Sequence, residues 1–132
     1  MATPVYPQTL DLSVLSRYTG RRFSSVVYGL VDPRQPGLVA YVGRSKGHVL
    51  GRYFQHISDG TNASGGCSQR VRWIAELVAI RSWPGLILIE SVTDRRYLLA
   101  ERESWWIAQY KKRGEAWVNR ICEIQWEHRQ KE

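Results

Sequence analysis

Two short apolar runs joined by a turn-rich connector, with a helix after them, limit this chain to a small set of folds. Residues 25–31 and 37–43 are rich in β-branched side chains, and the connector between them contains two prolines. This pattern predicts two strands paired as a β-hairpin. Glycine favours turns, so Gly43 is predicted to end the second strand.

From about His48 the apolar residues are spaced three and four apart, which predicts an amphipathic helix. Arg52 and His56 are four residues apart and are therefore neighbours on one side of that helix, away from the apolar stripe. The helix is thus expected to offer a cation and an imidazole to whatever lies over the hairpin. The residues expected to face inward are Leu50, Tyr53, Phe54 and Ile57.

Further along the chain, the pattern predicts a polar loop at residues 58–66 and a second helix at residues 68–81. Arg70 and Arg72 of this helix are expected to face solvent. Residues 86–92 are almost continuously apolar, which predicts a buried strand at the centre of the sheet. A third helix is expected from near Asp94, followed by a short edge strand at residues 116–118.

One carboxylate stands out on the third helix. Leu99, Glu103, Trp106 and Tyr110 are spaced four, three and four apart, so Glu103 shares a stripe with three large apolar residues. A carboxylate on an inward stripe is costly unless it is paired or bound to a metal. Glu103 is therefore expected to hold a metal, to pair with an arginine such as Arg52, or to do both.

The charge of the chain favours a polyanionic partner, because 19 Lys and Arg residues oppose 12 Asp and Glu residues. Cys67 and Cys122 are far apart in the sequence and are expected to be reduced thiols. No apolar run approaches the length of a membrane span, and no signal peptide is evident. We therefore expect a cytoplasmic protein without membrane contact, built as one domain of 132 residues.

These motifs together resemble the GIY-YIG nuclease family. The two strand motifs correspond to residues 26–28, where Val26 replaces the leading glycine of the family, and to residues 41–43. The landmarks that follow in family order are Arg52, His56, a helix at residues 99–107 with Glu103, and Asn119. The resemblance assigns residues 23–122 to a GIY-YIG-like nuclease domain. Residues 1–22 would be an N-terminal arm that packs on the domain or contacts DNA, and residues 123–132 a polar tail.

The resemblance implies an α/β (α+β) fold, with a small three-stranded mixed or antiparallel sheet flanked by helices. It also implies a metal-dependent endonuclease that hydrolyses phosphodiester bonds in DNA, in which Glu103 binds one divalent cation, Mg²⁺ or Mn²⁺. Arg52 would bind the scissile phosphate. Tyr28 or Tyr41, both expected to face the cleft, would act as the base.

The remaining expected roles are supporting ones. His56 would assist proton transfer or contact phosphate, and Asn119 would orient a water or a phosphate oxygen. The cations expected to contact nucleic acid are Arg44, Lys46, Lys111 and Lys112. Two other readings stay open: a catalytically silent DNA-binding module, and a protein-interaction domain that uses its tryptophans. The sequence leaves the source of specificity open: a homodimer, the N-terminal arm, recognition of DNA structure, a recognition partner, or no specificity at all.

Overall fold

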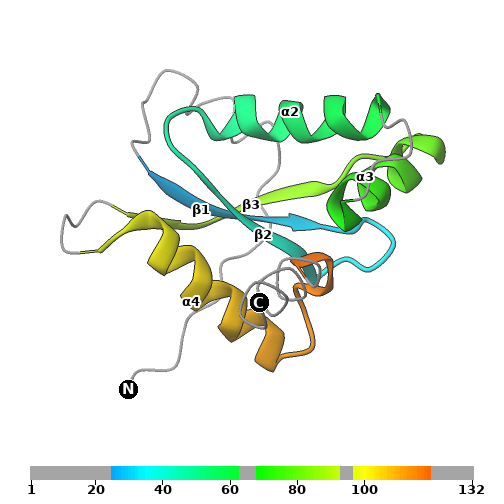
Figure 1. Cartoon of the computed structure of the whole chain (residues 1–132). Coiled ribbons are helices and arrows are strands. Elements are labelled where there is room, and N and C mark those ends of the chain that lie inside the picture. The colour runs from blue at the N-terminus through cyan, green and yellow to red at the C-terminus, as the bar shows by residue number, and fades with distance from the viewer. Residues whose placement is uncertain (1–24, 63–67, 93–96, 120–132) are drawn as a thin grey trace, which may run out of the picture.

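The computed structural model describes residues 25–62, 68–92 and 97–119. Its three strands form an antiparallel sheet in the order β2-β1-β3, with α2 and α3 on one face and α4 on the other (Figure 1). The predicted α+β fold with a small sheet flanked by helices is confirmed. The elements are β1 (Val26–Val31), β2 (Val39–Ser45), α2 (Val49–Thr61), α3 (Gln69–Ala79), β3 (Gly85–Ser91), α4 (Leu99–Lys112) and the 3₁₀ helix η1 (Trp117–Asn119).

Several predictions concern residues outside the described part of the chain. These are the N-terminal arm, both cysteines, the C-terminal tail and residues 63–66 of the loop predicted at residues 58–66. Within the described residues, no helix is long and apolar enough to cross a membrane.

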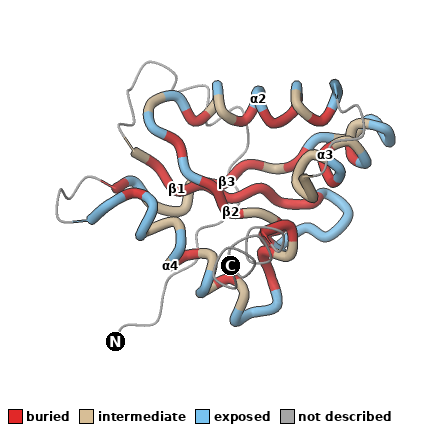
Figure 2. The backbone as a smooth tube through the Cα atoms, viewed as in Figure 1, coloured by how far each residue is buried: buried red, intermediate tan, exposed pale blue. Residues whose placement is uncertain are grey.

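The core consists of two apolar layers, one on each face of the sheet. Along β1, Tyr28 and Leu30 pack toward α2 and α3, whereas Val27 and Val31 pack toward α4. Successive side chains of a strand point to opposite faces, so a strand covered on both faces is apolar throughout. Figure 2 shows the result: the strands are largely buried and the helices are buried mainly on the side that faces the sheet.

The predicted position of the third strand was wrong. β3 lies at an edge of the sheet and β1 lies at the centre. Leu86 of β3 belongs to the layer under α2 and α3, and Ile87 to the layer under α4. A strand that is apolar on both of its faces therefore indicates that helices cover both faces of the sheet. It does not distinguish a central strand from an edge strand.

Gly43 was predicted to end the second strand, but β2 continues through Gly43 to Ser45. Gly43 pairs with Tyr28 across the sheet. A Cβ atom at Gly43 would lie 2.6 Å from the Tyr28 hydroxyl, so the tyrosine ring lies over the space that a side chain would fill. The glycine thus serves close packing inside a strand, and Arg44 projects from β2 and not from a loop.

The inward face of α2 also differs from the prediction. Phe54 is half-exposed, whereas His56 is completely buried. The stripe that contacts the core contains Val49, Tyr53, His56, Ile57 and Gly60, so it is turned toward His56 and away from Phe54. The helix continues to Thr61, and Gly60 in its last turn lies so close to the side chain of Ile74 on α3 that no Cβ atom would fit there.

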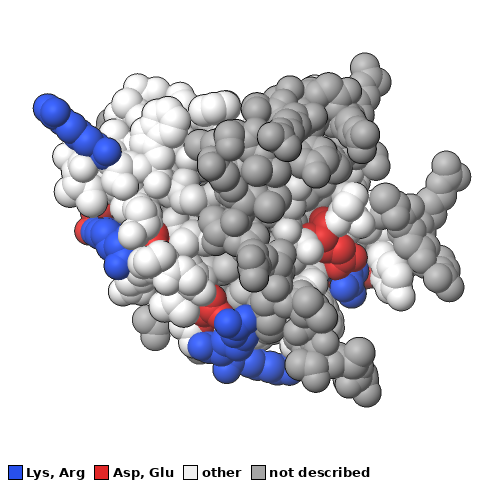
Figure 3. All heavy atoms as spheres, turned by 180° about the vertical axis from the view of Figure 1, so that it is seen from behind, with Lys and Arg blue, Asp and Glu red and all other residues white. Residues whose placement is uncertain are grey.

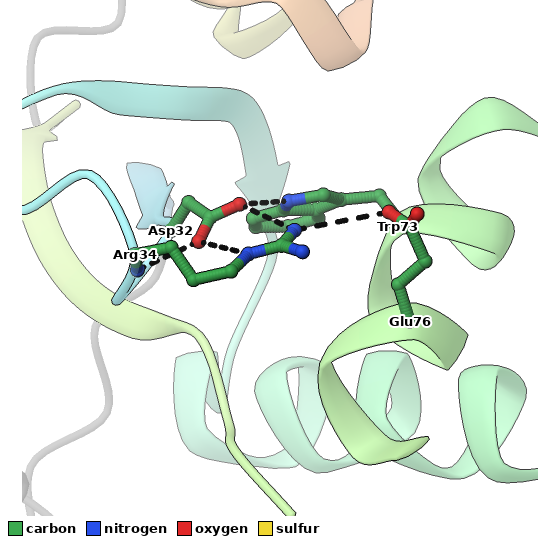
Figure 4. Close-up of polar contacts among 4 residues, drawn as sticks. All are labelled: Asp32, Arg34, Trp73 and Glu76. Atoms are coloured by element: carbon green, nitrogen blue, oxygen red, sulfur yellow. Dashed lines mark hydrogen bonds and ion pairs between the residues drawn. The ribbon is translucent and has the colours of Figure 1, made fainter. Parts of the chain in front are cut away.

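A buried polar cluster ties the end of β1 to α3 (Figure 4). The carboxylate of Asp32 accepts hydrogen bonds from the Trp73 indole at 2.8 Å and from the Arg34 guanidinium at 2.9 and 3.0 Å. The hydrogen bonds from Arg34 outweigh the opposing effect of burial and lower the pKa of Asp32 to about 2. Arg34 also reaches Glu76 at 3.7 Å. The sequence analysis did not identify Trp73 as a core residue.

The last two elements differ from the prediction: α4 begins later, and the element after it is not a strand. α4 begins at Leu99, not near Asp94. The predicted strand at residues 116–118 is wrong, because Trp117–Asn119 forms a 3₁₀ helix. The 3₁₀ helix lies against β2, where the Ala116 amide donates to the Val39 carbonyl at 2.7 Å.

Candidate active site

A cleft with a volume of about 630 Å³ lies at the C-terminal half of β2, where residues of α2 and α4 also reach. It is lined by side chains of the kinds that hydrolysis of a phosphodiester requires. These are the phenol of Tyr41, the cations of Arg44, Lys46 and Arg52, and the carboxylate of Glu103. The structure therefore brings together five of the predicted site residues, four from β2, the turn after it and α2, and one from α4, which lies far from them in the sequence.

The cleft is strongly basic, since three cations and one carboxylate line it. Elsewhere the charges are mixed. Figure 3 shows the molecule from behind, where the visible Lys and Arg side chains form separate groups that mostly lie next to Asp or Glu. Excess positive charge in a concave site concentrates anions there, so the cleft is suited to an anionic ligand.

Glu103 is the carboxylate of the cleft and lies largely out of water, with 20 % of its side chain exposed. Its Oε1 is 3.3 Å from an Nη1 of Arg44, whose own side chain is half-exposed. Burial raises the pKa of Glu103, and the positive charges of Arg44 and Arg52 offset only part of this effect. Pairing with an arginine was predicted, but the partner is Arg44 and not Arg52.

Two neighbours of Glu103 on α4 are hydrogen-bonded to the sheet. Glu90 on β3 accepts hydrogen bonds at its Oε1 from Arg102 at 2.8 Å and from the Trp106 indole at 2.7 Å. Burial opposes the ionisation of Glu90, but these hydrogen bonds outweigh it and lower its pKa. Arg102 precedes Glu103 directly, so the contact with Glu90 fixes the rotation of α4 that presents Glu103 to the cleft.

Tyr28 was predicted to face the cleft. Instead it lies beneath the cleft, and only 1 % of the residue is exposed. Its hydroxyl is 2.5 Å from Nε2 of His56, which is fully buried. Burial raises the pKa of Tyr28, and the nearby Tyr41 raises it further. Burial also lowers the pKa of His56 to about 3, helped by the charges of Arg70 and Arg52. At neutral pH this pair is therefore a neutral phenol beside a neutral imidazole.

Tyr41 is the tyrosine that lines the cleft. Its ring centroid lies 5.6 Å from that of His56 and 6.5 Å from that of Tyr28. The guanidinium of Arg70, which the sequence analysis placed on a solvated face, lies 5.9 Å from the Tyr41 ring centroid. The Tyr28–His56 pair and Arg70 thus pack around Tyr41 and hold its ring at the cleft.

Asn119 is buried and both of its polar groups are engaged by one residue of β2. Its Oδ1 accepts from the Val42 amide at 2.9 Å, and its Nδ2 donates to the Val42 carbonyl at 3.0 Å. Asn119 therefore pairs with the β2 backbone as a neighbouring strand would. It supports Tyr41 and Gly43 from the edge of the sheet and does not line the cleft.

Lys111 and Lys112 are not brought to the cleft. Lys111 donates to the Ala116 carbonyl at 3.3 Å, and Lys112 is exposed at the last residue of α4. Gly114 follows with a φ of 80°, and the Glu115 amide donates to the Tyr110 carbonyl. In this structure the two lysines are features of the C-terminal end of α4.

Three cleft residues were missed from the sequence: Ser45, His48 and Gln55. His48 precedes α2 directly and lines the cleft. Gln55 lies one turn after Arg52, and this spacing could have identified it.

The cleft offers a divalent cation one carboxylate. Within residues 25–62, 68–92 and 97–119 no three His, Cys, Asp or Glu side chains gather as a metal cluster. Mg²⁺ and Mn²⁺ prefer oxygen ligands and are commonly bound by one or two carboxylates with water completing the shell. Because Glu103 is partly desolvated and its one described partner is a half-exposed arginine, its carboxylate fits such an ion.

Comparisons of this chain with protein-family models, with curated proteins and with solved structures gave no match.

Proposed function

We propose that this chain is a metal-dependent endonuclease that hydrolyses phosphodiester bonds in DNA, similar to GIY-YIG nucleases. One observation carries the proposal: the partly desolvated carboxylate of Glu103 lines a cleft together with Arg44, Lys46 and Arg52. A surface that only bound a polyanion would gain nothing from a carboxylate there. Hydrolysis of a phosphodiester needs both positive charge for the phosphate and a carboxylate for a metal ion.

Arg52 is the residue we assign to the scissile phosphate. Its guanidinium can form two parallel charge-assisted hydrogen bonds with phosphate oxygens, and such bonds stabilise the charge that grows during hydrolysis. Arg52 lines the cleft from α2, opposite Glu103 on α4. Arg44 and Lys46 would hold neighbouring phosphates of the same strand.

Tyr41, and not Tyr28, is the phenol that we assign to the attacking water. Tyr41 lines the cleft, whereas Tyr28 is buried beneath it and stays protonated because its pKa is raised. The Tyr41 hydroxyl oxygen would accept a hydrogen bond from the water and orient it toward the phosphorus. Tyr28 and His56 would act through Tyr41 by holding its ring.

Glu103 would hold one Mg²⁺ or Mn²⁺. When bound, the ion supplies Lewis-acid stabilisation and lowers the pKa of a water molecule. The contribution of the chain is to keep the carboxylate ionised and turned toward the cleft, which the charges of Arg44 and Arg52 favour.

A catalytically silent DNA-binding module is the second candidate, and one contact favours it. The ion pair between Arg44 and Glu103 at 3.3 Å could be a fold contact with no metal. In that case the cleft would bind DNA without cutting it. Under either reading we propose that the protein is cytoplasmic. It would act on DNA as a monomer, as a homodimer or together with a recognition partner.

The test is cleavage of supercoiled plasmid in Mg²⁺, in Mn²⁺ and in EDTA, comparing the wild-type chain with Arg52→Gln and Arg81→Gln. Arg81 is exposed and does not line the cleft, so its variant is the matched control. We expect metal-dependent cleavage by the wild type and the control, and a loss of about 10²-fold or more for Arg52→Gln. Cleavage that Arg52→Gln retains would remove Arg52 from the site.

A further inference from the structure

A second cavity adjoins the cleft and shares two of its cations. It has a volume of about 470 Å³, and Arg44 and Lys46 line it as they line the cleft. Leu98, Leu99 and Ala100, at the beginning of α4, form its other wall. We call this second cavity the leucine pocket. Because the two cavities meet at Arg44 and Lys46, one extended ligand can occupy both.

The leucine pocket has a different chemistry from the cleft. Its wall on the α4 side is hydrocarbon, while its cations are those at the junction. Leu98 is 65 % exposed, more than any other large hydrophobic side chain among the described residues. An exposed leucine beside two cations contributes little to the core.

Helix capping does not explain Leu98 either. Leu98 is the N-cap residue of α4, and it makes no side-chain capping hydrogen bond. Ser, Thr, Asp and Asn are the residues that stabilise this position, and leucine is among the poorest. The side chain at position 98 thus contributes little to the core and does not cap the helix, and it lines a cavity together with two cations of the cleft.

The ligand that matches both cavities must place anionic groups at Arg44 and Lys46 and an apolar surface on Leu98. A nucleic acid strand does this, because its phosphates alternate with sugars and flat apolar base faces. In an intact duplex the base faces are stacked on one another and cannot lie on a protein side chain. Only an unpaired or unstacked nucleotide exposes one.

We propose that the leucine pocket binds the sugar and base of an unpaired nucleotide next to the scissile phosphate, with the base lying on Leu98. The nuclease cleft would therefore prefer DNA that is single-stranded or distorted at the cut over intact duplex. This inference rests on the proposed DNA-binding role of the cleft, and it requires no cleavage to be tested.

The experiment measures the affinity of the chain for a fluorescent single-stranded oligonucleotide and for the corresponding duplex, at low salt and in EDTA. Leu98→Ser is compared with wild type and with Ile80→Ser, which replaces another exposed aliphatic residue at 56 % exposure that lines neither cavity. Leu98→Ser should weaken single-strand binding by about tenfold, the scale of one lost base contact. Its duplex affinity should change less than about twofold, and Ile80→Ser should match wild type in both.

Lys46→Gln provides the comparison for a phosphate contact. It should weaken single-strand and duplex binding alike and reduce the dependence of affinity on salt concentration. Unchanged single-strand binding by Leu98→Ser would overturn the proposal, and so would an equal loss on both substrates. Because binding is measured without metal, a chain that binds DNA in this way but never cuts it would refute the nuclease and leave the leucine pocket standing.

Discussion

The hydroxyl of Tyr28 and Nε2 of His56 lie 2.5 Å apart in a space closed to solvent. Both residues belong to motifs that the sequence marks as catalytic, yet neither lines the cleft. Their contact supports the ring of Tyr41 from below. We therefore assign the proposed reactive surface to Tyr41, Arg52 and Glu103, which line the cleft, and a positioning role to the pair that packs against Tyr41.

The burial of His56 predicts a specific pH dependence of stability. The folded state keeps His56 neutral down to about pH 3, whereas the unfolded chain takes up the proton near pH 6.5. Below that pH the unfolded state binds more protons, so the free energy of unfolding should fall as pH falls from 6.5 toward 3. Through His56 alone, the free energy of unfolding can change by up to about 1.4 kcal/mol per pH unit.

His56→Phe should remove that contribution. Urea unfolding at several values between about pH 7.5 and pH 5 gives the slope for each protein. The slope should be smaller for His56→Phe than for wild type, while His48→Phe, which replaces an exposed histidine, should keep the wild-type slope. Equal slopes in all three proteins would show that His56 is not buried as a neutral imidazole.

Gly43 and Gly51 should respond oppositely to alanine. At Gly43 the added methyl would lie 2.6 Å from the Tyr28 hydroxyl, so Gly43→Ala should lower the free energy of unfolding by about 1–3 kcal/mol. At Gly51, on the exposed side of α2, the added methyl would lie 3.6 Å from the Cβ atom of His48, so Gly51→Ala should raise the free energy of unfolding by up to about 1 kcal/mol. Thermal and urea unfolding measure both. A harmless Gly43→Ala would mean that Tyr28 does not lie over β2.

Asn119 is predicted to be essential to the fold near the site. Asn119→Ala removes two buried hydrogen bonds and leaves the amide and carbonyl of Val42 without those partners. The expected loss of stability is about 2–4 kcal/mol. Asn62→Ala is the control, since Asn62 is exposed at the end of α2 and should change stability by less than about 0.5 kcal/mol. Similar small effects at both positions would contradict the pairing of Asn119 with β2.

Glu103 should weaken the fold at neutral pH. Its pKa in the folded state is raised above the ordinary 4.5, mainly by burial. Stability is therefore greatest when the group is protonated, and part of it is lost as pH rises through the raised pKa. Glu103→Gln should have a higher melting temperature than wild type at neutral pH, and this gain should disappear once the solution is acidic enough to protonate Glu103.

Glu101 provides the matched control on the same helix. It is exposed in the first turn of α4, where a negative charge is favourable. Glu101→Gln should lower the free energy of unfolding by about 0.3–1 kcal/mol at low ionic strength, opposite in sign to Glu103→Gln. If Glu103→Gln were the less stable variant at neutral pH, its carboxylate would be a structural ion-pair partner and the metal assignment would lose its support.

The local pattern of the sequence was sufficient to predict the three strands and the helices α2, α3 and α4, but not the 3₁₀ helix η1. The β-branched runs predicted β1 and β2, and the three-and-four spacing predicted α2 and α4. Glu103 could be singled out because a carboxylate on an inward stripe is unusual. These features depend on neighbouring residues alone.

The errors concern how the elements pack. Phe54 and His56 lie on different sides of α2, and the hydrophobicity of Phe54 wrongly suggested that its side is buried. Gly43 resembles a strand end unless it is known that the Tyr28 ring crosses it. The ion pair between Arg44 and Glu103 joins residues 59 positions apart, which no local pattern reveals.

Nicking of supercoiled plasmid in Mg²⁺ or Mn²⁺ by wild type and Glu103→Gln tests the central claim most directly. Both proteins must first give the same circular dichroism spectrum. We expect metal-dependent nicking by wild type and none by Glu103→Gln, together with retained DNA binding by both in EDTA. Nicking by Glu103→Gln at the wild-type rate would contradict the assignment of Glu103. DNA binding by wild type without cleavage of either the plasmid or a single-stranded oligonucleotide would contradict the nuclease itself.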